Sequence, residues 1–361
     1  MITAIEYHRS PLRFVAARGA NGRLTGRLGA TISGAVTGQL APLRLVSLPD
    51  PRRPGSGWGR VRPRLSGICG SDLALLSARS SPYLSPMVSM PFVPGHEIVG
   101  DLLDDVEGVA AGTRVVLDPV LSCAPRGTEI CSHCAAGTQS RCDHITAGVV
   151  GPGLQTGFCG DTGGGWGGML VAHGAQLHAV PDSLPDRGAV LIEPLACAIH
   201  TMRRAAVPDG TSVVIVGAGT VGLLTLLALK TFAAPGAVYV VAKHRHQADR
   251  ARTLGATDVV EPRRAARVLR RATGGSLQSP EQGSDFLLGG VDTAIECTGG
   301  SGLDSALRLV RAGGRVVLSG MPSSTVDLTP LWFRELTLVG AYASDSGGPG
   351  AGIEGTGIDG G

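Results

Sequence analysis

The stretch Val213-Val-Ile-Val-Gly217-Ala-Gly219-Thr-Val-Gly222 decides the fold of the second half of this chain. Its four β-branched residues predict a buried strand, and the apolar run after Gly222 predicts a helix. Gly217 permits a tight turn, Gly219 lets the backbone approach a ligand, and Gly222 lets the helix pack closely. Because N–H groups at the start of such a helix attract phosphate, we expect a dinucleotide site here. The predicted cofactor-binding residues of this turn are Gly217, Ala218, Gly219, Thr220, Val221 and Gly222.

Strand-like segments recur along the chain from the start of this motif. They occupy residues 213–216, 238–241, 293–296 and 316–319 and alternate with segments of helical length. This alternation is typical of a parallel sheet with helices on its faces. Residues 191–342 are therefore predicted to form a doubly wound α/β domain.

The first half of the chain has a different pattern. Short strand-like segments at residues 59–65, 98–103 and 113–117 are separated by Gly, Pro and Asp residues. This pattern predicts a mainly β domain over residues 1–190. The glycine-rich residues 19–39 within it are interpreted as a loop or insertion.

Composition and charge narrow the class of protein. The 361 residues exceed one ordinary domain, and 43% hydrophobic with 17% charged residues suit a folded chain. A net charge of +3 is too small to indicate a nucleic-acid or membrane partner. The N-terminus lacks an export-signal pattern, so a cytoplasmic location is expected. Five arginines on one predicted helix are interpreted as a solvated face, with RNA or DNA binding as the alternative: Arg263, Arg264, Arg267, Arg270 and Arg271.

The end of the strand at residues 238–241 bears on the choice of nicotinamide cofactor. A carboxylate usually stands there and binds the ribose hydroxyls of NAD. Here Ala242 occupies the position and is followed by Lys243, His244 and Arg245. Because no carboxylate would repel a 2′-phosphate, the sequence favours NADP over NAD, with Lys243 and Arg245 as cofactor ligands. The alternative is that these are ordinary exposed cations.

Two short motifs in the β-rich half carry metal-ligand residues. They are Cys69-Gly-Ser71-Asp72 and Gly95-His96-Glu97. Cys69 alone would be read as a buried cysteine and His96 as a loop histidine. A thiolate and an imidazole together, upstream of a nucleotide fold, favour a zinc site.

Four of the eight cysteines form a cluster, namely Cys123, Cys131, Cys134 and Cys142. Four thiolates can close a tetrahedral zinc site, and the Cys131-x2-Cys134 pair has the expected spacing. In a chain without an export signal, this usage favours metal binding over disulfides. The functional rival is a zinc ribbon that binds nucleic acid, but the interleaved basic and aromatic residues of such a module are missing.

These motifs resemble those of the zinc-dependent medium-chain alcohol dehydrogenases. They occur in the family's order, together with Glu193-Pro-Leu195 and Gly313-Gly-Arg-Val-Val-Leu-Ser-Gly320, and the resemblance runs from about residue 43 to 342. The Glu193 segment looks like the polyol (sorbitol) dehydrogenase branch. The resemblance implies a Rossmann domain and a mainly β GroES-like catalytic domain, with a cysteine-rich zinc lobe at residues 118–145.

The resemblance also implies roles for single residues. Cys69, His96 and Glu193 would bind the catalytic zinc, and Glu97 would be able to enter or leave its shell. The alternative for Glu193 is a carboxylate held by backbone amides at a helix N-terminus. Ser71 would relay the alcohol proton. Ala74 stands where the family often has a histidine, so a shortened or water-based relay is expected.

Two further cysteine assignments follow from the resemblance. Cys197 would face the nicotinamide, with simple packing as the alternative. The four clustered cysteines would hold a structural zinc. The family has two residues between the first and second cysteine, whereas residues 124–130 stand between them here, which leaves the ligand role of Cys123 open. His133 is a geometrically awkward substitute.

The implied activity is hydride transfer between a small alcohol, such as a polyol or sugar, and NADP or NAD in a homodimer or homotetramer. The enzyme alternative is a zinc-free quinone or enone reductase of the same superfamily. The family usually continues beyond the strand at residues 336–340, whereas this chain ends in the glycine-rich residues 343–361, which are expected to form no packed element. A truncated, non-catalytic nucleotide- or zinc-binding relative is therefore the third alternative.

Overall fold

The computed structural model describes residues 1–16, 42–300, 302–322 and 325–345. The predicted loop at residues 19–39 and most of the predicted tail lie outside them, and Ala343, Ser344 and Asp345 belong to no helix or strand.

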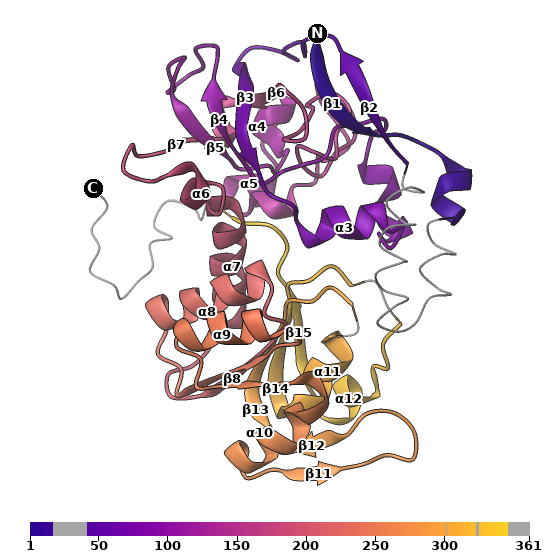
Figure 1. Ribbon diagram of the computed structural model, residues 1–361, viewed down its shortest axis with the longest axis vertical. Coiled ribbons are helices and arrows are strands. Elements are labelled where there is room, and N and C mark those ends of the chain that lie inside the picture. Colours follow the sequence, from indigo (N-terminus) through magenta and orange to yellow (C-terminus); the bar gives the residue numbers. More distant parts are fainter. Residues whose placement is uncertain (17–41, 301, 323–324, 346–361) are drawn as a thin grey trace. The chain divides into compact units, whose positions relative to one another are not determined.

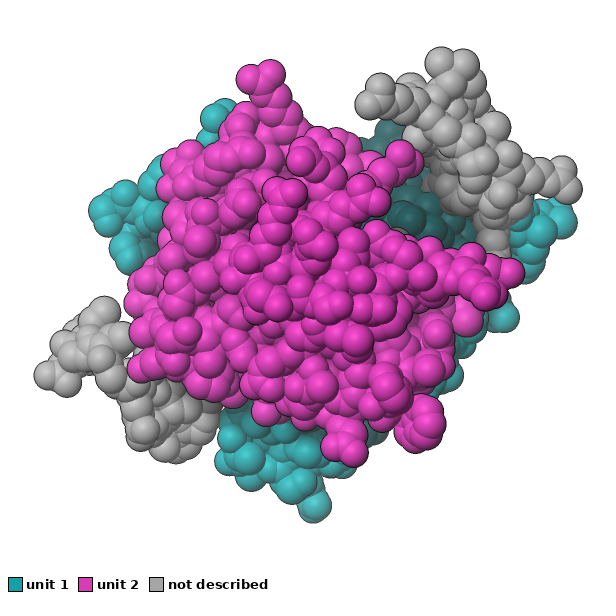
Figure 2. Space-filling view, turned by 90° about the horizontal axis from the view of Figure 1, so that it is seen from below, with its two compact units in different colours: residues 1–193, 345–350 teal, residues 194–344, 351–361 magenta. Residues whose placement is uncertain are grey.

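The described residues divide into two compact units (Figure 2). Unit 1 comprises residues 1–193 and Asp345, and unit 2 comprises residues 194–344. The division falls between Glu193 and Pro194, in the first turn of helix α7 (Ile192–Ala205).

A parallel sheet of six strands forms the centre of unit 2 (Figure 1). Its order is β10-β9-β8-β13-β14-β15, and every adjacent pair is parallel. The strands are β8 (Ser212–Val216), β9 (Ala237–Val241), β10 (Asp258–Val260), β13 (Val291–Glu296), β14 (Val310–Leu318) and β15 (Thr337–Gly340). The first strand lies inside the sheet and later strands extend outward on both sides of it. This is the doubly wound Rossmann order, which confirms the predicted fold class.

Helices cover both faces of this sheet because successive residues of a strand point to opposite sides. Val213 and Ile215 pack in one cluster with Leu226 of α8, whereas Val214 and Val216 pack in another with residues of α10 and α11. The elements concerned are α8 (Thr220–Phe232), α9 (Arg245–Thr253), η4 (Pro262–Arg264), α10 (Ala265–Thr273), α11 (Gly302–Leu309) and α12 (Thr329–Phe333). Two short strands, β11 (Ser276–Gln278) and β12 (Phe286–Leu288), form a separate antiparallel pair.

Unit 1 is built on an antiparallel five-stranded sheet in the order β6-β3-β4-β5-β7. The strands are β3 (Trp58–Ser66), β4 (Ile98–Leu102), β5 (Arg114–Leu117), β6 (Leu170–His173) and β7 (Leu177–Ala179). The first three coincide with the strands expected at residues 59–65, 98–103 and 113–117. A second sheet pairs β1 (Ile2–Tyr7) with β2 (Leu43–Leu48).

Further short elements of unit 1 lie in the connections between strands. They are α3 (Gly70–Leu76), η1 (Pro82–Met87), α4 (Cys123–Arg126), α5 (Ser132–Ala135), η2 (Gln139–Arg141), η3 (Gly174–Gln176) and α6 (Asp186–Ala189). The apolar run at residues 212–229 forms β8 and most of α8. None of the helices in the described part of the chain has both the length and the apolar character needed to cross a lipid bilayer.

Candidate metal centres and cofactor site

The first candidate centre forms where β3 ends and α3 begins. Cys69 is the N-cap residue of α3, and its backbone N–H donates to Oδ2 of Asp72 over 2.9 Å. This bond is half of a capping box, which fixes the direction in which the chain enters the helix. The thiol of Cys69 and the fully buried carboxylate of Asp72 are thereby held at one end of the helix.

Three predicted site residues meet at this point. Ligand atoms of Cys69, His96 and Glu97 all lie within 4.8 Å of one another. His96 and Glu97 directly precede β4, whose first residue is Ile98, and the backbone N–H of Gly67 donates to the carbonyl of Glu97 over 2.8 Å. A thiolate, an imidazole and a carboxylate are a donor set that suits zinc.

Negative groups surround His96. Burial lowers the pKa of His96, but a hydrogen bond with Cys69 and the charges of Asp72, Cys69 and Glu193 together raise it to about 10. The site therefore attracts positive charge strongly at this point. A divalent cation satisfies the same attraction while leaving the imidazole neutral, as a metal ligand must be.

Asp72, which belongs to the sequence motif but has no predicted role, lies beside the imidazole of His96. Its Oδ1 lies 3.8 Å from Nδ1 of His96, and both atoms are buried without a hydrogen-bond partner among the described residues. Carboxylates commonly orient a metal-bound histidine through its other ring nitrogen. The ring also packs against Phe158, with centroids 5.9 Å apart. The Cys69-x-x-Asp72 capping pattern is the sequence signal that could have singled out Asp72.

The two carboxylates assigned to the catalytic zinc lie differently. Glu97 belongs to the group with Cys69 and His96, and burial raises the pKa of its carboxyl. Glu193, in the first turn of α7, is near enough to act on His96 electrostatically but lies outside that group among the described residues. Its role as the third ligand stays a prediction.

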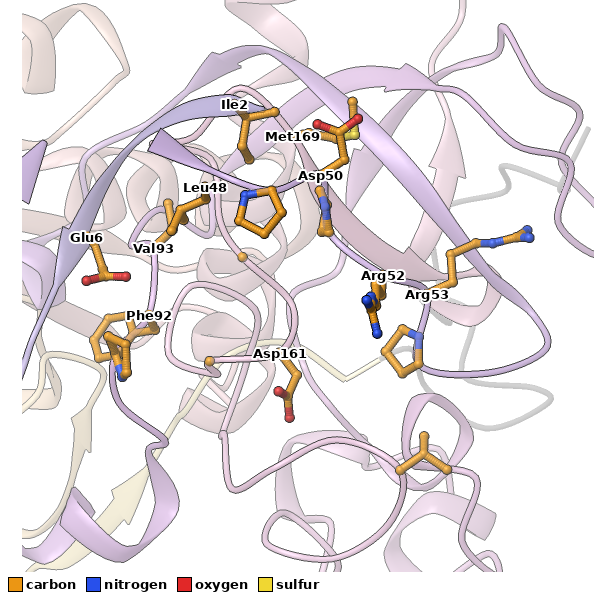
Figure 3. A pocket seen from close by; sticks show the side chains of 17 residues that line it. Ile2, Glu6, Leu48, Asp50, Arg52, Arg53, Phe92, Val93, Asp161 and Met169 are labelled. Carbon is orange, nitrogen blue, oxygen red and sulfur yellow. The ribbon is translucent and has the colours of Figure 1, made fainter. Parts of the chain in front are cut away.

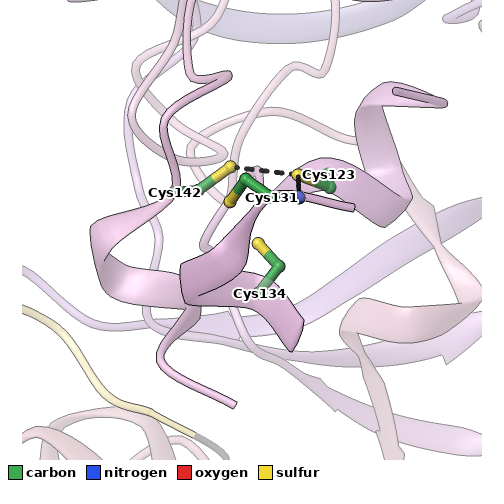
Figure 4. A group of neighbouring side chains, drawn as sticks. All are labelled: Cys123, Cys131, Cys134 and Cys142. Carbon is green, nitrogen blue, oxygen red and sulfur yellow. Dashed lines mark hydrogen bonds between the residues drawn. The ribbon is translucent and has the colours of Figure 1, made fainter. Parts of the chain in front are cut away.

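The second centre is the cysteine cluster (Figure 4), in which ligand atoms of all four cysteines lie within 4.8 Å of one another. Cys131 and Cys134 are the N-cap and an interior residue of α5, so their thiols lie one helical turn apart on one side. Sγ of Cys123 lies 3.5 Å from Sγ of Cys142. The residues between Cys123 and Cys131 thus leave Cys123 within the cluster, and the donor set fits a structural zinc.

Hydrogen bonds already favour thiolate in part of this cluster. Burial raises the pKa of Cys123, but donors including the backbone N–H of Cys131 outweigh it and lower the pKa to about 6. Burial raises the pKa of Cys142 to about 11.

His144 is a residue that the sequence reasoning missed. Its Nδ1 lies 3.3 Å from Sγ of Cys123 and 3.2 Å from the hydroxyl of Thr128, and its backbone N–H donates to Sγ of Cys142 over 3.4 Å. His133, the substitute ligand considered from the sequence, is outside the group of ligand atoms in the described chain. His144 follows the fourth cysteine by two positions, which is the only signal the sequence offers.

The glycine-rich turn in unit 2 has the geometry that dinucleotides require. Gly217 has φ = +106°, and a Cβ on Gly222 would lie 2.0 Å from the carbonyl oxygen of Gly217. A Cβ on Gly219, the N-cap of α8, would meet no atom within 4 Å. The turn therefore leaves open space at the N-terminus of a thirteen-residue helix, where phosphate binds favourably.

The end of β9 carries positive charge. Ala242 is buried, whereas Lys243, His244 and Arg245 are exposed at the start of α9. The ring of His244 stacks on that of His246 with centroids 5.7 Å apart. Cys197 lies within α7, where its carbonyl accepts a bond from the Thr201 hydroxyl. The contact of Cys197 with a nicotinamide stays a prediction.

A pocket of about 630 Å³ lies elsewhere in unit 1 (Figure 3). Its wall includes Ile2, Leu48, Phe92 and Asp161. Cys69, His96 and Glu97 are not among its lining residues, so it is separate from the candidate metal centre.

Comparison with known proteins agrees with this geometry. The family model described as the alcohol dehydrogenase GroES-like domain matches residues 55–182, and that of the zinc-binding dehydrogenase matches residues 220–349. L-idonate 5-dehydrogenase of Vitis vinifera is 32% identical over 292 residues, which cover 78% of this chain and 72% of that protein. Sorbitol dehydrogenase of Arabidopsis thaliana is 30% identical, with 78% and 73% covered. The chain belongs to the zinc-dependent medium-chain alcohol dehydrogenase family.

Solved structures agree with the fold of this alcohol dehydrogenase. A structure from Sinorhizobium meliloti 1021, described as a zinc-binding dehydrogenase bound to NADP, is 26% identical and covers 96% of this chain and 85% of that one, with a TM-score of 0.66. The 2R,3R-butanediol dehydrogenase of Bacillus subtilis shares the fold with a TM-score of 0.64 at 22% identity over 96% of this chain and 85% of that one. As a member of the family, the chain is a zinc-dependent oxidoreductase that uses NAD(P) and acts on alcohols.

Proposed function

We propose that this alcohol dehydrogenase oxidises a hydroxyl group of a polyol or sugar with NADP. The meeting of Cys69, His96 and Glu97 beside the buried carboxylate of Asp72 carries the proposal. The relatives named L-idonate 5-dehydrogenase and sorbitol dehydrogenase support the substrate class, since both names denote polyhydroxylated substrates.

Zinc and nicotinamide fit the residues that are present. Cys69 and His96 would hold the catalytic zinc together with a carboxylate from Glu97 or Glu193, and the turn at residues 217–222 would hold the cofactor diphosphate. The four clustered cysteines would hold a structural zinc. When bound, zinc supplies the Lewis acidity that lowers the pKa of an alcohol hydroxyl, and the nicotinamide supplies a hydride acceptor.

Protein groups perform the remaining work. Asp72 and Phe158 hold the imidazole of His96 in place. The Oγ atom of Ser71 is buried and has no hydrogen-bond partner among the described residues, so its hydroxyl is available to relay the alcohol proton, accepting it while passing on its own. Ala74 is buried on α3 and cannot carry that proton onward, so the relay beyond Ser71 is shortened or passes through water.

The basic residues after β9 support NADP as the cofactor. A 2′-phosphate beside Lys243 and Arg245 would gain favourable charge interactions, and Ala242 offers no carboxylate to repel it. We also propose a homodimer or homotetramer, the assemblies usual in this family. The same proposal includes a cytoplasmic location.

The test is a panel of primary alcohols, secondary alcohols and polyols, each assayed with NAD and with NADP alongside metal analysis. The expected result is two zinc ions per chain and fastest reduction of NADP with a polyol. Cofactor binding without turnover of any alcohol would instead identify a non-catalytic relative. Turnover of a quinone or enone by the metal-free protein would identify a reductase.

A further inference from the structure

An arginine lies inside the cysteine lobe with its whole side chain buried. Arg126 is the last residue of α4, three positions after Cys123, and has 0% of its surface exposed. It falls within residues 124–130, which lengthen the spacing between the first two cysteines.

The guanidinium of Arg126 donates hydrogen bonds to the backbone both before Cys123 and after Cys142. Its Nε donates to the carbonyl of Leu121 over 2.9 Å, just before Cys123. Its Nη atoms donate to carbonyls that follow Cys142, at distances from 2.6 to 3.3 Å: Ala147, Val150, Gly151 and Gly153. One side chain thus closes the loop that carries the four thiols.

These bonds engage all three guanidinium nitrogens of Arg126 but give its charge no carboxylate partner. Among the described residues no acidic side chain forms an ion pair with it. The thiols that act on its charge are those of Cys159, which lies outside the cluster, and of the cluster residues Cys142 and Cys123. A buried cation without a counter-charge is costly. Four thiolates around one Zn²⁺ carry a net charge of −2, which would supply the missing counter-charge.

We propose that Arg126 is a positioning residue of the structural zinc site and stabilises its zinc-loaded form by compensating the negative charge of the four thiolates. This inference rests on the proposed structural zinc. It also explains the longer spacing after Cys123, because the additional residues include the cation Arg126.

A second buried arginine provides a matched control. Arg334 in unit 2 has 5% of its surface exposed and also donates to backbone carbonyls, those of Leu307, Gly289 and Val310. Burial is the only influence on the pKa of Arg334, with no cysteine acting on it. Arg334→Met therefore controls for the loss of a buried, carbonyl-bound arginine elsewhere in the chain, and Arg126→Lys controls for the carbonyl bonds inside the lobe.

The experiment measures zinc release from the zinc-loaded full chain to a chromogenic chelator. Arg126→Met is expected to release the zinc of the cysteine cluster at least about tenfold faster than wild type, since groups around a metal's ligands commonly contribute that much to affinity. Arg334→Met is expected to release it at the wild-type rate. Arg126→Lys keeps the charge, loses most of the carbonyl bonds, and should fall between wild type and Arg126→Met.

Each outcome has a distinct meaning. Equal release from Arg126→Met and wild type, or equally fast release from Arg126→Met and Arg334→Met, overturns the inference. If Arg126→Met does not fold, Arg126→Lys decides: release less than tenfold faster than wild type supports charge compensation, and release at least tenfold faster contradicts it. Failure of the structural zinc itself is distinguishable, because wild type and Cys131→Ser would then hold the same amount of zinc.

Discussion

A Cβ atom placed on Gly67 would lie 1.8 Å from Oε2 of Glu97. Because Gly67 has no side chain, the Glu97 carboxylate can occupy this space beside Cys69 and His96. Any side chain at position 67 must push that carboxylate out of its place.

Gly67→Ala is therefore expected to displace Glu97 and weaken the catalytic zinc site about 10- to 100-fold. The measurement is zinc affinity at that site together with kcat/KM. Gly70→Ala is the matched control, because a Cβ there meets no atom within 4 Å and Gly70 is the first residue of α3. Equal zinc affinity in the two variants would show that Glu97 has no part in holding the metal.

Asp72→Asn tests the residue that orients His96. The change keeps the shape of the side chain but removes the charge 3.8 Å from Nδ1 of His96. We expect a 10- to 100-fold loss of zinc affinity at the catalytic site and a modest loss of stability, about 1 kcal/mol, from the altered cap of α3. The readouts are metal titration and thermal unfolding.

Ser77→Ala separates the two effects of Asp72. Ser77 is the C-cap residue of the same helix and donates to the carbonyl of Leu73 over 2.7 Å, away from the metal ligands. Its loss should lower the unfolding temperature while zinc affinity stays unchanged. If Asp72→Asn changes only the unfolding temperature as well, Asp72 is merely a cap.

The sequence predicts the role of a residue when that role follows from the residue type. It does not predict a role that depends on what surrounds the residue in the fold. The turn at Gly217 and Gly222 was predictable because its backbone geometry is possible for glycine and for little else. The roles of Asp72, Arg126 and His144 were not, because polar residues in loops acquire meaning only when the fold buries them beside a thiol or an imidazole. Glu193 shows the reverse case, since family resemblance singles it out while Glu97 joins the close group of ligand atoms.

A single substitution tests the proposed preference for NADP. Ala242→Asp places a carboxylate at the end of β9, where it would bind ribose hydroxyls and repel a 2′-phosphate. We expect KM for NADP to rise at least about tenfold, with KM for NAD unchanged or lower. Steady-state kinetics with both cofactors provide the measurement.

Lys243→Ala should act in the same direction more weakly, because Arg245 remains. Arg263→Ala, which removes an exposed cation on η4, is the control and should leave both KM values unchanged. A wild-type enzyme that already favours NAD, or a Lys243→Ala variant with unaltered KM for NADP, would contradict the assignment of these cations to the 2′-phosphate.

Asp292 provides a pH-dependent test of how unit 2 is held together. Near the start of β13, its Oδ2 accepts bonds from the backbone N–H and the hydroxyl of Ser212 on β8, and its Oδ1 accepts from Nε of Arg311 over 2.7 Å. Burial raises the pKa of this carboxyl, but the bonds from Arg311 and Ser212 outweigh it and lower the pKa from 3.8 to about 2. The ionised form is therefore favoured in the folded protein.

A lowered pKa contributes stability that is fully present above the unfolded value of 3.8 and disappears as the pH falls through about 2. Asp292→Asn should cost about 1 kcal/mol near pH 7 after allowance for solvent screening, and the cost should shrink between pH 4 and pH 2. Unfolding free energies of wild type and variant across this range measure it. Asp209→Asn, at an exposed position, is the control. The difference in unfolding free energy between wild type and Asp292→Asn could instead stay constant down to pH 2. In that case the hydrogen-bond geometry of Asp292, and not its charge, stabilises the contact between β8 and β13.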